Sequence, residues 1–283
     1  MKIGIGLPNQ VRNVRPTVIP EWAAQAERAG FSTLGTVGRI AYPGVMDTVA
    51  LAAAAGVTSV IKLITNILIA PVWPPALLAK EIAGIDGISG GRLTLGIGTG
   101  GHRDDFVTEG LGPQGRGKRL DHSLAIYRAI WKGEPIGGTN PAVPTGTREV
   151  PILFGGFSNP AFERMARWGQ GYIGASMPAA TVADAFAKAR AAWAGAGREG
   201  SPRLVAIAYY AFGDIDAGRA NVHHYYSAHG DELADATASG VNGGPDAVRS
   251  AVQQFAAIGA DELIFNPTLD NPEEILRLAD AVL

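Results

Sequence analysis

Apolar and polar residues follow two rhythms along this chain: short β-rich runs alternate with longer stretches of helical spacing. Apolar residues at positions 78, 82, 85 and 88, for example, mark one face of a helix. The short runs predict strands at 3–7, 33–37, 60–69, 93–97, 152–154, 171–175, 204–212 and 262–265. Helices are predicted between them, at 21–29, 47–55, 75–88, 120–131, 160–168, 182–193, 245–258 and 272–282.

Strands that alternate with helices favour a parallel sheet, because parallel strands need helical crossovers. Eight such units can close, so the pattern predicts the α/β class and a (β/α)8 TIM barrel, with an open doubly wound sheet as the alternative. Two segments interrupt the pattern and are interpreted as insertions: the Pro/Gly/Thr-rich stretch 134–150 and the stretch 214–244. A chain of 283 residues suits one barrel domain over 1–283.

Composition narrows the class of protein. A net charge of -2 gives no footprint for nucleic acid or an anionic membrane, and the absence of Cys excludes disulfides and thiolate catalysis. No apolar run approaches the roughly 18 residues of a membrane span, and the first strand lacks the apolar core of a signal peptide. We therefore expect a cytoplasmic protein with a small-molecule substrate and with neither nucleic-acid nor membrane partners.

Barrel enzymes place their chemistry at the C-terminal ends of the strands. The residues predicted there are rich in amides, hydroxyls and glycine: Asn9, Arg39, Tyr42, Thr65, Asn66, Thr99, Gly100, Gly101, His102, Gly155, Gly156, Phe157, Ser158, Asn159, Ser176, Tyr209, Tyr210 and Asn266. Paired carboxylates for hydrolysis and His/Asp clusters for a metal do not occur in this set, so we predict no metal site. Such a site suits a flat polar cofactor that carries the chemistry itself.

The loop 98–101, Gly-Thr-Gly-Gly, is the strongest phosphate signal, because glycines let backbone N–H groups approach an anion closely. Gly96, Gly98 and Gly101 also match the dinucleotide fingerprint, but Asp121, at the required spacing, begins a helical stripe instead of ending a strand. Ser158 and Asn159 precede a predicted helix and can hold a phosphate at its N-terminus or act as an ordinary N-cap. The basic run 115–119 is interpreted as a solvated turn.

Nearly the whole chain resembles the bacterial luciferase-like, flavin-dependent oxidoreductases and their deazaflavin-using relatives. The resemblance rests on AERAGFSTL, PPALLAKEIAGIDGISGGRLTLGIGTGG, RLDHSLAIYRAIWKGE and PILFGGFSNPAFERMARWGQGYI. It implies a TIM barrel with FMN or the deazaflavin coenzyme at its mouth. Thr99 and Ser158 align with phosphate contacts, and Thr65-Asn66 with a non-prolyl cis peptide that supports the flavin ring.

The resemblance implies cofactor contacts from Thr65, Asn66, Thr99, Gly100, Gly101, Gly155, Gly156, Ser158 and Asn159. Gly38 and Arg39 stand where luciferase-type members have an acidic residue and a histidine, so the catalytic residue is unknown and Arg39 and His102 are weak candidates. Insertions such as 134–150 and 214–244 usually shape substrate access in this family.

The resemblance implies a monooxygenase that uses reduced FMN and O₂, a flavin reductase that supplies the reduced cofactor, and a homodimer. The alternatives are deazaflavin-dependent hydride transfer and a non-catalytic flavin-binding barrel.

Overall fold

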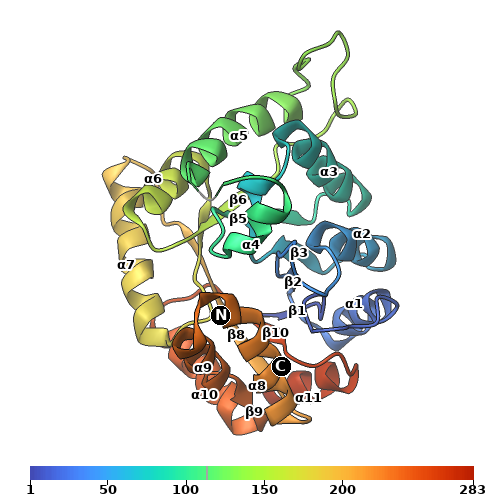
Figure 1. Cartoon of the computed structure of the whole chain (residues 1–283), viewed down its shortest axis with the longest axis vertical. Helices are drawn as coiled ribbons and strands as arrows, with labels where there is room; N and C mark the ends of the chain where they lie inside the picture. Colours follow the sequence, from blue (N-terminus) through green and yellow to red (C-terminus); the bar gives the residue numbers. More distant parts are fainter. Residues whose placement is uncertain (113) are drawn as a thin grey trace.

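Eight parallel strands close into a barrel in the computed structural model, which describes residues 1–112 and 114–283 (Figure 1). The strands follow one another around the barrel in chain order, and β8 pairs with β10 through the register Val205 to Glu262, which closes the ring. Closure confirms the predicted TIM barrel and excludes the open sheet. The eight strands are β1 (Lys2–Gly6), β2 (Thr33–Thr36), β3 (Lys62–Thr65), β5 (Leu93–Gly98), β6 (Ile152–Gly155), β7 (Gly171–Ile173), β8 (Arg203–Ala211) and β10 (Glu262–Pro267).

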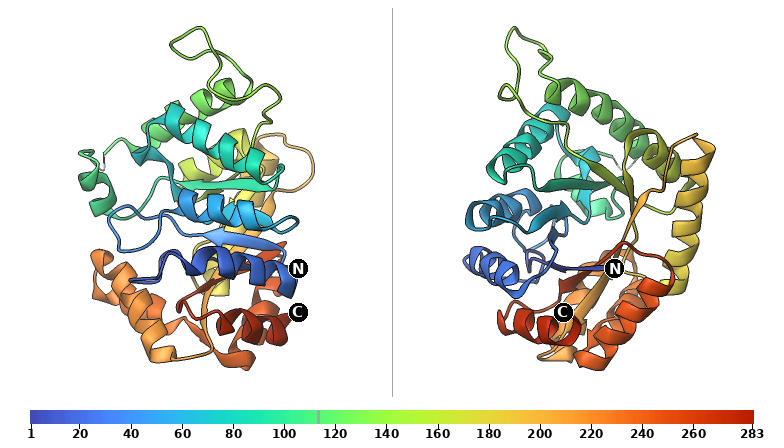
Figure 2. Two further views of the ribbon diagram at one scale, coloured as in Figure 1. Left: turned by 90° about the vertical axis from the view of Figure 1, so that its right-hand side faces the viewer. Right: turned by 180° about the vertical axis from the view of Figure 1, so that it is seen from behind.

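The helices that connect these strands form the outer layer of the barrel (Figures 1 and 2). Gly30, at φ 94°, ends the first of them, and its N–H bonds the carbonyl oxygens of Ala26 and Glu27. The outer helices are α1 (Val18–Ala29), α2 (Asp47–Val57), α3 (Pro75–Ile88), α5 (Arg116–Trp131), α6 (Asn159–Trp168), α7 (Ala179–Gly195), α10 (Gly244–Ala257) and α11 (Glu273–Val282). Among the described helices, none is both long enough and apolar enough to cross a membrane.

Several helices, turns and short strands that the apolar pattern does not predict accompany the barrel. Helices α4 (Arg103–Thr108), α8 (Ile215–Tyr226) and α9 (Asp231–Ser239), with the 3₁₀ turns η1 (Ala70–Val72) and η2 (Ser227–His229), follow the strand ends. The predicted strand 60–69 is divided into β3 and β4 (Leu68–Ile69), and β9 (Asn242–Gly243) pairs with the end of β8. The left view of Figure 2 shows α4 and α8 on one side of the barrel and both chain termini on the other.

The barrel interior is filled by branched side chains from several strands, as expected for this fold. They are Ile64, Leu153, Ile173, Val205, Ile207 and Ile264. A larger apolar layer lies between the strands and the surrounding helices. Glycine allows close packing where strands meet: a Cβ on Gly96 would lie 2.0 Å from the carbonyl oxygen of Thr65.

A buried carboxylate joins three strands at the N-terminal end of the barrel. Glu262, 1% exposed on β10, accepts hydrogen bonds from Ser32 Oγ at 2.5 Å and Thr33 Oγ1 at 2.6 Å. Its other oxygen accepts from Arg203 Nη2 on β8 at 2.5 Å. The carboxylate thus links the first and last parts of the chain where the barrel closes.

The two insertions lie at different places on the barrel, so one expectation is wrong. Segment 134–150 connects the end of α5 to the start of β6, and projects outward from the helices (Figures 1 and 2). Arg148 fixes it by donating to both oxygens of Asp86 at 2.7 Å and to the carbonyl of Leu93, where β5 begins. An α-to-β connection belongs to the N-terminal end, so only 214–244, which follows β8, lies at the mouth.

Candidate active site

A cavity of about 360 Å³ opens at the C-terminal ends of the strands, the end that faces the viewer in Figure 1. It is lined mainly by loops that follow β2, β3, β5, β6 and β7 and by the end of α8. The predicted strand-end residues that line it are Asn66, Thr99, Gly100, Gly101, His102, Gly155, Gly156, Phe157, Ser176, Tyr209 and Asn266. Thr65, Ser158, Asn159 and Arg39 are not among its lining residues.

Two amide side chains meet in this cavity. Asn66 Nδ2 donates to Asn266 Oδ1 at 3.1 Å, and each residue is only 2% exposed. Within the described residues, this leaves Asn66 Oδ1 and Asn266 Nδ2 buried without a partner. A buried polar atom without a partner costs about 1–3 kcal/mol, so one free acceptor beside one free donor is typical of a site that binds a polar ligand.

Thr65 packs the barrel instead of facing the cavity. Its hydroxyl donates to the carbonyl of Gly96 at 2.7 Å and accepts from the N–H of Gly96 at 2.9 Å. The cis peptide joins Asn66 to Ile67, one bond later than the predicted Thr65-Asn66. Thr65 therefore positions β3 against β5. Its neighbours Asn66 and Ile67, in contrast, line the cavity and can contact a ligand.

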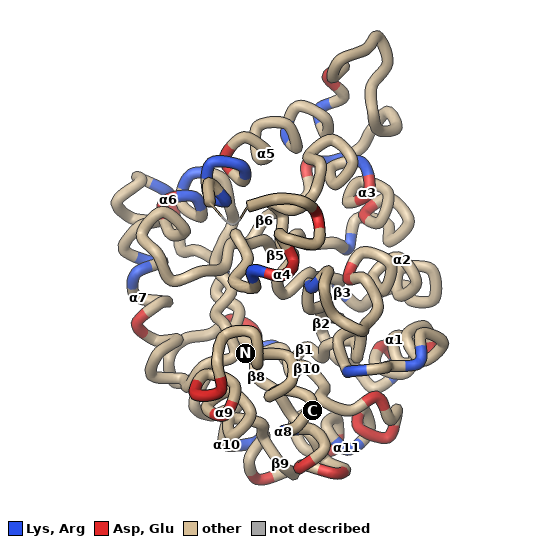
Figure 3. The backbone as a smooth tube through the Cα atoms, in the orientation of Figure 1, with Lys and Arg blue, Asp and Glu red and all other residues tan. Residues whose placement is uncertain are grey.

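An arginine side chain that the sequence analysis did not assign to the site contacts the glycine loop after β5. Arg116 Nη1, at the start of α5, donates to the carbonyl of Gly100 at 2.5 Å. Figure 3 shows Lys and Arg gathered beside α5 and α6. The interpretation of the run 115–119 as a solvated turn is therefore wrong for Arg116. In the sequence, only the position of Arg116 just before a predicted helix could have indicated this contact.

Ser158 is the N-cap of α6, and its hydroxyl makes no capping hydrogen bond. Ser158 and Asn159 are exposed and directly follow Gly156 and Phe157, which line the cavity. The hydroxyl and the N-terminus of a ten-residue helix thus lie at the rim, where both favour an anion.

An imidazole and several phenols form an aromatic wall of the cavity. The ring of His102 lies 4.1 Å from that of His229 and 5.3 Å from that of Tyr225, and Tyr226 lies beside them. Burial, with smaller contributions from Arg39 and His229, lowers the pKa of His102 to about 3. Burial likewise raises the pKa of Tyr225 well above 10. His102 and Tyr225 are therefore neutral at neutral pH, and His102 Nδ1 has no partner among the described residues.

Arg39 lies behind this wall and is already engaged. It is 4% exposed, its Nη2 lies 2.6 Å from Asp104 Oδ2, and its Nε lies 2.8 Å from Asp105 Oδ2. Its Nη1 donates to the carbonyl of Tyr225 at 3.2 Å. Because both α4 carboxylates neutralise it, Arg39 is placed to hold α8 over the mouth, not to bind a substrate anion.

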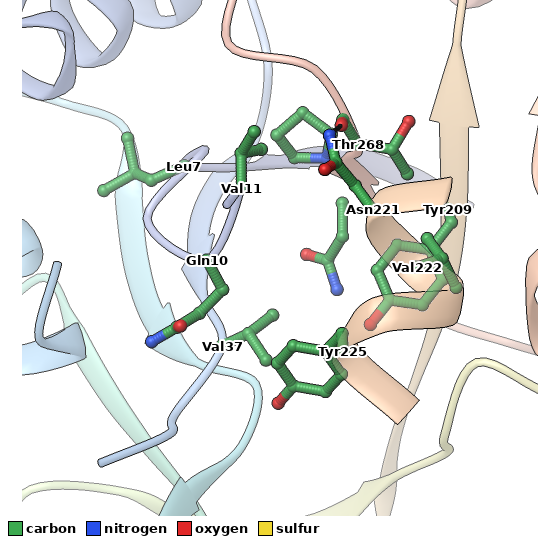
Figure 4. A pocket seen from close by; sticks show the side chains of 11 residues that line it. Leu7, Gln10, Val11, Val37, Tyr209, Asn221, Val222, Tyr225 and Thr268 are labelled. Carbon is green, nitrogen blue, oxygen red and sulfur yellow. Dashed lines mark hydrogen bonds between the residues drawn. The ribbon is translucent and has the colours of Figure 1, made fainter. Parts of the chain in front are cut away.

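A second, much smaller cavity lies beneath α8 (Figure 4). Its volume is about 30 Å³, and Val11 and Val37 face Val222 and Tyr225 across it. Such a space can hold water but is too small for a substrate. The cavity at the mouth, where the predicted strand-end residues gather, is therefore the candidate active site.

The family model for luciferase-like monooxygenases matches residues 1–273. The chain belongs to this family. An uncharacterised protein of Mycobacterium tuberculosis is 33% identical over 170 residues, which cover 56% of this chain and 60% of that protein. The chain thus spans about three fifths of the length of this curated relative.

Solved luciferase-like structures share the barrel over almost their full length. An F420-dependent secondary alcohol dehydrogenase, in complex with an F420–acetone adduct, has a TM-score of 0.81 at 15% identity and covers 99% of this chain and 98% of its own. The oxygenating constituent of 3,6-diketocamphane monooxygenase from Pseudomonas putida, in complex with FMN, has a TM-score of 0.77 at 20% identity, with coverage of 99% and 96%. At these identities the likeness shows the fold.

A packing constraint accounts for Gly38 at the position where luciferase-type members have an acidic residue. A Cβ on Gly38 would lie 2.7 Å from Asp47 Oδ2 and 2.8 Å from the carbonyl oxygen of Ile67. Asp47 is fully buried at the start of α2. Any side chain at position 38 of the luciferase-like protein would have to displace this carboxyl or the backbone of Ile67 and Leu68.

We expect Asp47→Asn to stabilise this luciferase-like protein increasingly as the pH rises. Burial raises the pKa of Asp47 from 3.8 to about 7, so the folded protein retains a proton that the unfolded chain releases near pH 4. Stability must therefore fall as the pH rises from about 4 to about 7. Asparagine has no such penalty, and its stability advantage should grow by about 3 kcal/mol between about pH 5 and 8.

Urea denaturation of wild type and variant at several pH values measures this difference. Asp246→Asn is the matched control, because Asp246 lies exposed in the first turn of α10. A stability difference for Asp47→Asn that stays constant with pH would show that the folded protein holds an ionised Asp47.

Proposed function

We propose that this luciferase-like protein is a monooxygenase that uses reduced FMN and O₂ on a small organic substrate bound at the barrel mouth. The observation that carries the proposal is the amide pair of Asn66 and Asn266, two residues that line the cavity and leave Asn66 Oδ1 and Asn266 Nδ2 buried without a partner among the described residues. The pyrimidine edge of a flavin offers the complementary N–H and carbonyl groups. Bound reduced FMN would supply the chemistry, activation of O₂ and transfer of one oxygen atom to the substrate.

The residues around the cavity fit the remainder of such a cofactor. Gly98, Gly100, Gly101, Gly155 and Gly156 line the cavity, and glycine has no Cβ to keep a phosphate from its backbone N–H group. Thr99, Ser158 and Asn159 add polar side chains at the rim, and Arg116 adds the positive charge that a phosphate requires. We assign the phosphate to the space between these two loops.

The second task of the chain is to keep water from the reacting atoms. Tyr209, Tyr225 and Tyr226 lie over the cavity from β8 and α8, and the hydroxyls of Tyr209 and Tyr226 are 3.3 Å apart. Burial raises the pKa of Tyr209 well above 10, so these phenols remain neutral. A neutral aromatic cover can exclude water without introducing a competing nucleophile.

One observation favours a second candidate function, hydride transfer with the deazaflavin F420. His102 lines the cavity with Nδ1 unpartnered among the described residues, and burial keeps its imidazole neutral, so it can accept a hydrogen bond from the hydroxyl of an alcohol and orient that alcohol as its hydride leaves. We expect His102→Gln to lower kcat strongly in this case and only weakly in an FMN oxygenation. The expected partners, a reductase and a second copy of the chain, belong to the FMN proposal.

Binding and turnover test these proposals together. FMN and F420, each oxidised and reduced, are titrated against the protein, and Asn66→Ala and Asn266→Ala should each weaken binding of the accepted cofactor. Oxidation of the reduced cofactor is then followed with a panel of neutral organic substrates. Selective binding of FMN supports the monooxygenase, and selective binding of F420 supports hydride transfer. Binding without any turnover would leave a non-catalytic barrel, and binding of neither cofactor would reject all three.

We expect Ser158→Ala to weaken cofactor binding about five- to thirtyfold, which corresponds to one charge-assisted hydrogen bond of about 1–2 kcal/mol. The hydroxyl of Ser158 caps no backbone group, so its removal should leave folding intact. Isothermal titration measures the affinity, and Ser201→Ala is the matched control because Ser201 is exposed just before β8 begins. An unchanged affinity for Ser158→Ala would move the phosphate away from α6.

A further inference from the structure

A second large cavity lies directly beside the one at the mouth. Its volume is about 420 Å³, and it is formed by the loop after β7, by β8, and by α9 and α10. Both cavities are lined by Ser176, Ile207 and Tyr209, so these three side chains form the wall between them. A molecule held in this side chamber would contact the same three side chains that line the mouth.

The chemistry of the lining restricts what can bind. None of the described residues that line the side chamber has an ionisable acid or base that is charged at neutral pH, and most are apolar, such as Met177, Leu233 and Phe255. An anion or cation would lose its hydration there without gaining a partner, which is strongly unfavourable. The chamber is also within the size range of pockets that take small organic ligands.

Among the described residues that line the side chamber, one buried side-chain polar atom has no partner. Thr237, Asn242 and Gln254 already make hydrogen bonds through their side chains. Ser176 Oγ, in contrast, is buried without a partner among the described residues, on the wall shared with the mouth. Its hydroxyl can donate to a carbonyl oxygen or accept from a hydroxyl group at the point where a ligand would enter the mouth.

We propose that the side chamber binds the body of a neutral, largely apolar substrate, whose single carbonyl or hydroxyl group bonds Ser176 and so faces the mouth. The inference rests on the proposed function, because it names the class of substrate for that site. Charged substrates, including carboxylates, are excluded by the same lining.

Displacement of a neutral fluorescent probe, N-phenyl-1-naphthylamine, tests the inference with and without FMN. We expect 2-decanone to displace the probe in both conditions. Decanoate should need about a tenfold higher concentration for the same displacement, because its charge has no partner in the chamber. Ser176→Ala should lower the affinity for 2-decanone about fivefold, which corresponds to the loss of one neutral hydrogen bond. Decanoate that binds as well as 2-decanone would overturn the assignment.

A pair of tryptophan variants locates the binding. Ala236→Trp places a large ring in the side chamber and should lower the affinity for 2-decanone at least about tenfold, because the ring fills the chamber. Ala187→Trp, on the exposed face of α7, should leave the affinity for 2-decanone unchanged. Equal affinities in both variants would reject the chamber as the binding site. FMN and F420 affinities of Ala236→Trp are measured in parallel. Failure of cofactor binding in the wild type rejects the proposed function, and failure of the chamber tests alone rejects only this inference.

Discussion

Replacing Arg39 with methionine is expected to lower the free energy of unfolding by roughly 3–5 kcal/mol, the usual cost of leaving a buried charge without its partner. Asp105 is fully buried, and its pairing with Arg39 would be lost. The contact between Arg39 and the carbonyl of Tyr225 would also be lost, so α8 should detach more readily from the mouth. Denaturant unfolding measures the first effect, and hydrogen exchange over 215–229 measures the second.

Arg219→Met is the matched control for this experiment. Arg219 also contacts an aspartate on α8, but its pair with Asp216 is exposed and 3.8 Å long. Such surface pairs contribute about 0–1 kcal/mol, so the control should unfold almost like the wild type. If Arg39→Met were no more destabilising than Arg219→Met, Arg39 would not hold α8, and a role in binding a ligand would again be open.

Glu262→Ala should destabilise the barrel by a similar amount, roughly 3–5 kcal/mol. The substitution removes the carboxylate that accepts hydrogen bonds from Ser32, Thr33 and Arg203. This carboxylate on β10 connects β2 to β8. The loss lies at the end of the barrel opposite the mouth, so cofactor affinity should be retained in the folded fraction. Urea unfolding and cofactor titration of the same sample separate the two effects.

An exposed glutamate provides the comparison. Glu273 pairs with Arg277 at 2.9 Å on α11, with both side chains largely in solvent. Glu273→Ala should therefore change stability by less than about 1 kcal/mol. Equal stability of Glu262→Ala and Glu273→Ala would show that the buried carboxylate contributes nothing net to closure of the barrel.

Most of the fold could be predicted because its strands are buried on both faces and read as continuous apolar runs. Each of the predicted strands overlaps one that the structure contains, and α3 has the predicted bounds of 75–88. The helices α4, α8 and α9 could not be predicted in this way. Helices α4 and α9 are short, with 6 and 9 residues, and α8 has few buried residues, namely Gly218, Val222 and Tyr225. Such helices give no apolar stripe for a pattern to detect.

Part of the candidate site could also be predicted, because a strand end has a fixed place in a closed barrel. Asn66, Thr99 and His102 line the cavity for this reason. The partners of those residues depend on the tertiary structure, and the sequence does not reveal them. Arg116 reaches Gly100 from the start of another helix, and Arg39 is neutralised by carboxylates more than 60 positions away.

The outward course of segment 134–150 has a consequence for how relatives should be compared. Residues 134–141 are all exposed, and Arg148 anchors the segment to Asp86 far along the chain. The segment can therefore change in length or composition without altering the walls of the mouth. A classification of these proteins by the segment 134–150 would therefore group them by the shape of their surface. A classification by the stretch 214–244 would group them by residues that line the mouth, such as Tyr225 and Tyr226.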